Sequence, residues 1–205
     1  MQKEYIVKSV NGDFCWDDID KAEVNIFRWE NGGYEPETFG QIVWHNDSEL
    51  KVKITCFESA PRITKRKFMD AVCEDSCLEF FFSLDKSKPD VYVNLEANAG
   101  GAALMNINST LKTIPKRSLD KILGYVPFYA PEILDDRWSI EFHLTREELK
   151  KIFPDVEVKK GLEFSGNIYK CGDKTDIPHF GMWNYVGTDA PSFHQPTYFG
   201  KFIID

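Results

Sequence analysis

The chain has 205 residues, of which 42% are hydrophobic and 14% aromatic, and its formal net charge is −8. This composition suits a single folded domain spanning residues 1–205 and excludes a disordered chain. The acidic balance argues against a general binder of nucleic acids or of anionic membranes, since both classes need clustered Lys and Arg.

The N-terminal residues carry no recognisable targeting signal. Residues 1–14 lack the long apolar region of a signal peptide. No stretch of the chain approaches the ~18 apolar residues needed to cross a bilayer. If Met1 is the native start, these features predict a cytoplasmic protein.

The first clear strand pattern lies in residues 48–59, SELKVKITCFES. Leu50, Val52 and Ile54 alternate there with polar side chains. This period of two predicts a strand with one buried face. The preceding residues 39–47, FGQIVWHND, predict its hairpin partner, with the turn in HNDSE.

Two further alternating segments, 76–84 and 91–101, predict a second hairpin. One face of each strand is expected to enter the core. The opposite faces are predicted to point outward, and Glu79 would then lie beside Glu96 on the neighbouring strand. The outward side chains of the second strand are Tyr92, Asn94, Glu96 and Asn98.

A helix is predicted to follow the strand at residues 137–144. Thr145 and Glu148 have the spacing of a capping box. Strand patterns return at residues 162–171 and 198–205. Many short strands and one short helix, without repeated strand–helix units, predict an all-β fold. The expected form is an antiparallel β-sandwich of the immunoglobulin or jelly-roll type.

The five cysteines, an odd number, are expected to have free thiols. Cys73 and Cys77 are not at the usual CxxC spacing, although Cys171 and His179 would complete four potential zinc ligands. We therefore predict no metal site. We also predict no cofactor and no catalytic residues, because no GxGxxG, P-loop, HExxH or GxSxG motif occurs.

Residues 179–200, HFGMWNYVGTDAPSFHQPTYFG, form a dense aromatic run without Lys or Arg. Such a segment either closes a core or presents aromatic faces to a ligand. Trp183, in a strand-like run, is predicted to belong to the core. Phe193 lies between Pro191 and Pro196, whose fixed φ angles are expected to hold its ring out toward a ligand.

Several fragments occur in the order found in a known family. CWDDIDKAEVNIFRW, IVWHNDSELKVKITCFES, EDSCLEFFFSLD, VYVNLEANAGG and RWSIEFHLTREEL each resemble one of its motifs. The most specific fragment is FSGNIYKCG followed by HFGMWNYVGTDAPSFHQPTYFGKFII, with FHQP and FG at fixed separation. From Trp16 to Ile204 the chain therefore resembles the carbohydrate-binding family 9-like domains, which belong to the DOMON-like group of β-sandwiches.

The resemblance implies a sandwich with a carbohydrate-binding face and a saccharide as ligand. It also implies that a bulky neighbour presses on the backbone at Gly200. The resemblance implies that family members hold the end of a sugar chain between two Trp rings. This chain has Val72 or Cys73 in place of one ring and Phe193 in place of the other. The predicted sugar-binding residues are Phe193, His194, Tyr92, Asn94, Glu96 and Arg62.

Three functions stay open at this point. The resemblance favours a non-catalytic domain that recognises a sugar or the end of an oligosaccharide. Glu79 and Glu96, as neighbouring carboxylates, also allow a glycoside hydrolase, or the chain is an accessory protein in carbohydrate catabolism. The third function is protein contact by a sandwich that has lost its sugar site. The sequence does not define an oligomeric state.

Overall fold

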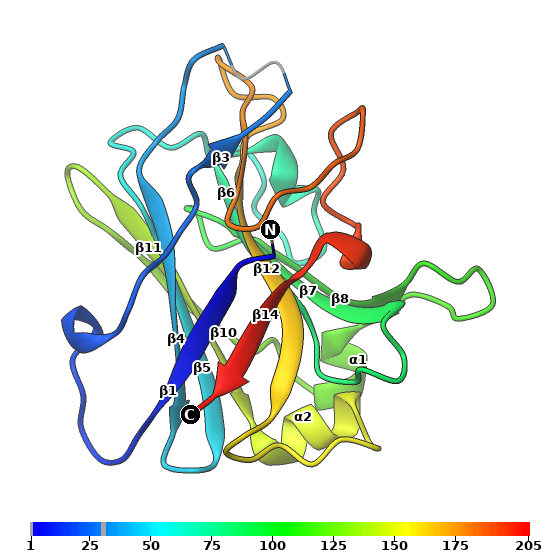
Figure 1. Ribbon diagram of the computed structural model, residues 1–205. Helices are drawn as coiled ribbons and strands as arrows, with labels where there is room; N and C mark the ends of the chain where they lie inside the picture. Colours follow the sequence, from blue (N-terminus) through cyan, green and yellow to red (C-terminus); the bar gives the residue numbers. More distant parts are fainter. Residues whose placement is uncertain (1, 30–31) are drawn as a thin grey trace.

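The computed structural model describes residues 2–29 and 32–205, in which strands predominate over helices (Figure 1). The strands are β1 (Glu4–Val10), β2 (Ala22–Glu23), β3 (Ile26–Phe27), β4 (Thr38–His45), β5 (Glu49–Cys56), β6 (Cys77–Ser83), β7 (Val91–Asn98), β8 (Ala103–Ser109), β9 (Arg117–Ser118), β10 (Phe128–Ile133), β11 (Trp138–Thr145), β12 (Glu163–Cys171), β13 (Phe180–Met182) and β14 (Gly200–Ile204). The helices are α1 (Leu119–Leu123) and α2 (Arg146–Ile152), with 3-10 turns η1 (Trp16–Asp18), η2 (Val72–Glu74) and η3 (Pro196–Tyr198). Among the described residues, no helix combines the length and the apolar character needed to cross a membrane.

The main strands form one hydrogen-bonded path in the order β10-β11-β5-β4-β1-β14-β12-β6-β7-β8-β9. This sheet curls, and its two halves face each other across a core (Figure 1). The halves approach closely where a Cβ on Gly40 of β4 would lie 2.5 Å from the Ile168 side chain of β12. The prediction of a mostly β fold is confirmed.

Strand β1 joins the two halves and departs from the predicted antiparallel arrangement. Glu4–Val7 pair in parallel with Lys201–Ile204 of β14, and Lys8–Val10 pair in parallel with Val43–His45 of β4. The prediction of a purely antiparallel fold is therefore wrong at this strand. Side-chain alternation shows which face of a strand is buried, but it carries no signal for the direction of a partner far away in the sequence.

The core between the two halves contains the side chains that alternation assigned to it. Leu50, Val52 and Ile54 of β5 are at most 2% exposed, and Phe80 and Phe82 of β6 are fully buried. We call this core the inner cluster. Its members include Tyr5, Val7, Ile42, Trp44, Leu50, Val52, Ile54, Phe80, Phe82, Val93, Leu95, Trp138, Ile140, Phe142, Phe164, Ile168, Trp183 and Phe202.

Trp183 and Gly200 occupy the positions predicted for them. The Trp183 ring is 4% exposed, and its centroid lies 4.8 Å from that of Phe202. A Cβ on Gly200 would lie only 2.3 Å from the Trp183 ring, so that a larger residue would have to displace the tryptophan. The predictions of a core position for Trp183 and of a bulky neighbour at Gly200 are both confirmed, and the structure shows that the neighbour is Trp183.

The other face of β12, β6, β7 and β8 is covered, although the sequence predicted that it points outward. Tyr92, Asn94 and Glu96 of β7 are all at most 4% exposed. Residues 172–199 fold over this face, and alternation within a strand cannot show that a distant segment will cover it. The apolar residues buried here, which we call the outer cluster, are Val72, Cys77, Phe81, Tyr92, Ala102, Tyr169, Cys171, Met182, Val186, Phe193 and Phe199.

The predicted helix begins at Arg146, as α2. The Thr145 hydroxyl accepts a hydrogen bond from the Glu148 amide at 3.2 Å, and the Glu148 carboxylate accepts one from the Thr145 amide at 2.8 Å. This capping box is confirmed. The expectation of one helix is wrong, because α1 is also present. Helix α1 has only five residues before its C-cap at Gly124 (φ 86°), which is too few to show helical periodicity in the sequence.

Candidate functional site

A cavity of about 210 Å³ lies between the outer face of the sheet and the C-terminal loops. Strands β6, β7 and β12 each contribute a side chain to it, and η2 and residues 173–194 supply the rest. We call it the outer cavity. It is lined by Cys73, Glu79, Glu96, Cys171, Asp173, Phe180, Pro191, Ser192, Phe193 and His194.

Five of the six predicted site residues meet at this cavity. Glu96, Phe193 and His194 line it directly. The Tyr92 hydroxyl lies 2.9 Å from Nδ1 of His194. Asn94 Nδ2 donates a hydrogen bond of 2.6 Å to Glu96 Oε1. The outward-facing side chains of β7 and the residues of the C-terminal loop thus form one connected group.

Phe193 is packed more tightly than its sequence context predicted. It is 9% exposed and stacks on Tyr169 with the ring centroids 4.0 Å apart and an angle of 11°. The Tyr169 hydroxyl also donates to the Phe193 carbonyl at 3.3 Å. The ring is therefore not held out toward solvent. Flanking prolines fix φ angles, but they do not decide whether a loop folds back onto the sheet.

Two carboxyl groups stand side by side at the cavity. Glu79 and Glu96 are directly opposite each other in the β6–β7 register and are 2% and 4% exposed. Burial, together with the neighbouring Glu96, raises the pKa of Glu79 well above its ordinary value. Burial raises the pKa of Glu96 to about 7. The pKa of Asp173 is also raised, chiefly by burial.

His194 contributes an imidazole ring to the lining of the cavity. Burial, with a smaller effect of the Lys116 charge, lowers its pKa to about 4. The imidazole is therefore neutral near pH 7 and offers one donor and one acceptor. With the carboxyl groups, it gives the cavity several polar atoms that suit hydroxyl ligands.

Val72 and Cys73 are the two residues expected in place of one tryptophan of the family, and the structure buries them differently. Cys73 lines the outer cavity, whereas Val72 is fully buried in the outer cluster. Asp173 and Phe180 also line the cavity and were not predicted as site residues. Their only sequence signal was their place, Phe180 within the aromatic C-terminal run as the first residue of β13 and Asp173 shortly before it, because only the fold brings them to β6 and β7.

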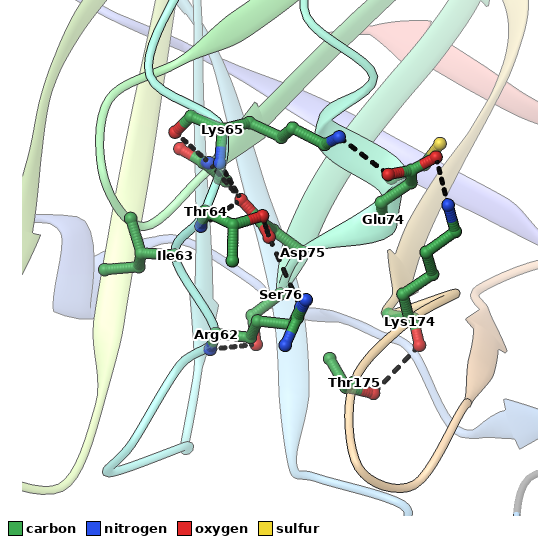
Figure 2. A network of polar contacts seen from close by, with 12 residues as sticks. Arg62, Ile63, Thr64, Lys65, Glu74, Asp75, Ser76, Lys174 and Thr175 are labelled. Carbon is green, nitrogen blue, oxygen red and sulfur yellow. Dashed lines mark hydrogen bonds and ion pairs between the residues drawn. The ribbon is translucent and has the colours of Figure 1, made fainter.

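Arg62 lies away from the other predicted site residues. Its Nε is 3.6 Å from Asp75 Oδ1, and its backbone amide donates to Ser76 Oγ at 2.9 Å (Figure 2). It lines a separate pocket of about 360 Å³ together with Tyr34 and Glu58. Proximity in sequence to the acidic motif does not bring this side chain to the outer cavity, since Asp75 draws it to the other side.

Asp75 anchors the loop that carries Arg62 and leads to Cys73. Its carboxylate accepts hydrogen bonds from the Thr64 and Lys65 amides at 2.8 and 2.7 Å, and from Asn98 Nδ2 at 2.8 Å. These donors hold the pKa of Asp75 below its ordinary value against the effect of burial. Glu74 continues the network with ion pairs to Lys65 and Lys174 (Figure 2).

A buried lysine lies behind the pocket that contains Arg62. Lys170 is fully buried, with its Nζ 2.7 Å from His179 Nε2 and 3.5 Å from Glu58 Oε2. Trp138 Nε1 donates to the same Glu58 oxygen at 3.0 Å. Sequence patterns do not predict this network, because its members come from four separate segments.

The sequence profile described as carbohydrate-binding family 9 matches residues 10–204. Among curated proteins, no sequence matches the chain.

Solved structures with the same fold cover nearly the whole chain. A protein from Bacteroides uniformis ATCC 8492, provisionally described as carbohydrate-binding, is 26% identical, with a TM-score of 0.81 and 100% of both chains covered. A family 9 carbohydrate-binding module from Caldicellulosiruptor kristjanssonii in complex with glucose is 9% identical, with a TM-score of 0.68 and 99% and 96% coverage. The same organism's module in complex with cellotriose is 10% identical, with a TM-score of 0.65 and 98% and 93% coverage.

Proposed function

The chain belongs to carbohydrate-binding family 9, whose profile spans residues 10–204, and on this premise we propose that it is a non-catalytic domain that binds a saccharide in the outer cavity. Its curled sheet corresponds, on this proposal, to the β-sandwich of the family. The structurally similar modules that hold glucose and cellotriose support a sugar as the ligand class.

The observation that carries the proposal is the mixed lining of the outer cavity. A sugar ring has C–H groups on its face and hydroxyl groups along its edge, so its site combines an aromatic ring with polar side chains. Phe193 and Phe180 supply the aromatic surface, and Glu79, Glu96 and His194 supply polar atoms. The two chemical requirements meet within one cavity.

The size of the cavity limits the length of saccharide that it can hold. Its volume of about 210 Å³ is smaller than the ~300–1,000 Å³ of pockets that enclose drug-sized molecules. This volume favours one sugar unit or the end of a chain over an internal stretch of polysaccharide. Because Cys73 replaces one aromatic ring, we expect binding weaker by about 1 kcal/mol or more, or about fivefold to tenfold, than in a two-ring clamp.

Hydrolysis is the weaker alternative for the same cavity. A glycoside hydrolase needs one ionised carboxylate and one protonated acid flanking the scissile bond. Burial raises the pKa values of both Glu79 and Glu96. Neither Lys nor Arg is among the described residues lining the cavity. No cationic Lys or Arg side chain of the described lining therefore holds one of the two carboxyls in its ionised form.

A glycan array followed by calorimetric titration of the best saccharide tests the proposal. We expect Glu96→Gln and Asp173→Asn each to weaken binding about fivefold, as for the loss of one hydrogen bond worth about 1 kcal/mol. Both substitutions keep the shape of the side chain. The matched control is Glu163→Gln, which removes an acid of β12 that pairs with Lys86 outside the cavity.

The control should bind the saccharide as the unmodified protein does. Chromogenic glycosides should not be cleaved. If the folded protein binds no saccharide on the array, or if the cavity variants bind as well as the control, the outer cavity is not a sugar site.

A further inference from the structure

Three potential metal ligands converge at the floor of the outer cavity. Cys77, Glu79 and Cys171 each place one ligand atom within 4.8 Å of the others. All three side chains are at most 2% exposed. We call them the thiol–carboxylate group.

The sheet register explains why these side chains meet. Cys77 and Glu79 are two residues apart on β6 and therefore point to the same face. Cys171 of β12 is directly opposite Cys77 in the antiparallel pair. Because their backbones are held in the sheet, the three side chains are positioned before any ligand arrives.

A third cysteine lies close to the group. Cys73 lines the same cavity as Glu79 and Cys171. Its carbonyl oxygen lies 3.9 Å from the Cys171 sulfur and accepts a 2.9 Å hydrogen bond from the Asp173 amide. The 3-10 turn η2 therefore keeps a third cysteine beside the thiol–carboxylate group.

We propose that the thiol–carboxylate group binds one Zn²⁺ ion, with the sulfurs of Cys77 and Cys171 and a carboxylate oxygen of Glu79 as its protein ligands. A water molecule supplies the fourth ligand. Sulfur donors favour zinc over the oxygen-seeking Mg²⁺ and Ca²⁺. Two thiolates and a carboxylate with a fourth position match the four-coordinate preference of zinc.

The proposed ligands hold protons that a cation would displace. The Cys171 thiol donates a hydrogen bond to Glu79 Oε1 at 3.0 Å. A Zn²⁺ ion would displace the two thiol protons, and its two positive charges would offset two of the three negative charges of Cys77, Cys171 and Glu79 within the buried site. Lys170 lies beside the group, with its Nζ donating to the Cys171 carbonyl at 3.1 Å, and its positive charge faces the one that remains.

This proposal revises the expectation of no metal site, which rested on the spacing of Cys73 and Cys77. Spacing along the chain identifies ligands on one loop. Here the sheet register pairs a cysteine of β6 with one of β12, which the linear sequence does not display. The proposal does not rest on sugar binding, although Glu79 and Cys171 also line the cavity proposed for the sugar.

The test uses reduced, chelator-treated full-length protein titrated with Co²⁺ and then with Zn²⁺. We expect one Co²⁺ per chain with the absorption of a thiolate complex, its displacement by Zn²⁺, and a higher melting temperature with Zn²⁺. Cys171→Ala should weaken Zn²⁺ binding at least a hundredfold. Glu79→Gln, which preserves the shape of the side chain, should weaken it at least tenfold.

Two control variants separate this site from nonspecific binding by thiols. Cys15→Ser removes an exposed thiol, and Cys56→Ala removes a buried thiol of β5. Both should bind Zn²⁺ as the unmodified protein does. If the reduced protein binds no Zn²⁺ in a one-to-one ratio, or if Glu79→Gln and Cys171→Ala bind it normally, the proposal is overturned.

Discussion

The two faces of β6 and β7 are both buried, but different parts of the chain cover them. The inner face, with Phe80, Phe82 and Leu95, packs against the other half of the curled sheet. The outer face, with Glu79 and Glu96, is covered by the C-terminal loops.

The difference between the faces lies in what burial costs. The inner cluster buries mostly hydrocarbon, which is favourable in itself. The outer face also buries carboxyl groups and polar amides, which lose hydration. Asn108 Nδ2 bonds Asn94, and Asn94 bonds Glu96, so part of that cost is offset by hydrogen bonds. Buried polar groups with shifted pKa values are typical of binding sites, and this contrast supports the outer cavity as the functional region.

The largest effect is expected on the inner face. Trp183→Ala should lower the free energy of unfolding by about 3–5 kcal/mol, because it removes a buried ring and leaves a cavity beside Phe202. Chemical denaturation measures this change. A loss below about 1 kcal/mol, the range of an ordinary surface substitution, would contradict the assignment of Trp183 to the core.

Phe193→Ala tests whether the outer face also contributes to stability. We expect a loss of about 2–3 kcal/mol, less than for a fully enclosed ring, because Phe193 stacks on Tyr169 but also borders the outer cavity. The same denaturation experiment applies. A midpoint equal to that of the unmodified protein would mean that packing on Tyr169 adds nothing to stability, as expected for a ring held out toward a ligand.

Glu96 gives the outer face a pH dependence. Its pKa is raised from 4.5 to about 7 in the folded protein. The folded state therefore keeps a proton that the unfolded chain releases, and stability falls as pH rises from about 4.5 to 7. Glu96→Gln should melt a few degrees higher than the unmodified protein at pH 8, with the difference shrinking toward pH 5.

Neighbouring Glu79 and Asp173 also have raised pKa values, so Glu96→Gln should keep part of the pH slope. The matched control is again Glu163→Gln. If Glu96→Gln has the same melting temperature as the unmodified protein at every pH, the carboxyl is hydrated and the outer face is open to solvent.

The smallest effect is expected from Tyr92→Phe. This change keeps the ring packed against Phe199 and removes only the hydroxyl that lies 2.9 Å from His194. We expect a loss of about 1 kcal/mol in the free energy of unfolding, the usual value for one hydrogen bond. A loss above about 3 kcal/mol would show that the Tyr92–His194 pair holds the whole C-terminal loop in place.

The local rules of the sequence determined much of the fold. Alternation placed Leu50, Val52 and Ile54 in the core, and the capping box at Thr145 fixed the start of α2, since both depend on neighbours within a few residues. Ordered motifs predicted the family. They also identified five residues that lie at the outer cavity or bond to its lining, because Phe193 and His194 belong to the FHQP motif and the other three share one strand face.

Only the tertiary structure decided how distant segments meet. The parallel pairing of β1, the loops that cover the outer face and the departure of Arg62 toward Asp75 each depend on partners far away in the sequence. The same holds for Cys77 and Cys171, which strand register places opposite each other. A side-chain pattern encodes which face of a strand is apolar, but hydrogen-bonded register and long-range packing determine what that face contacts.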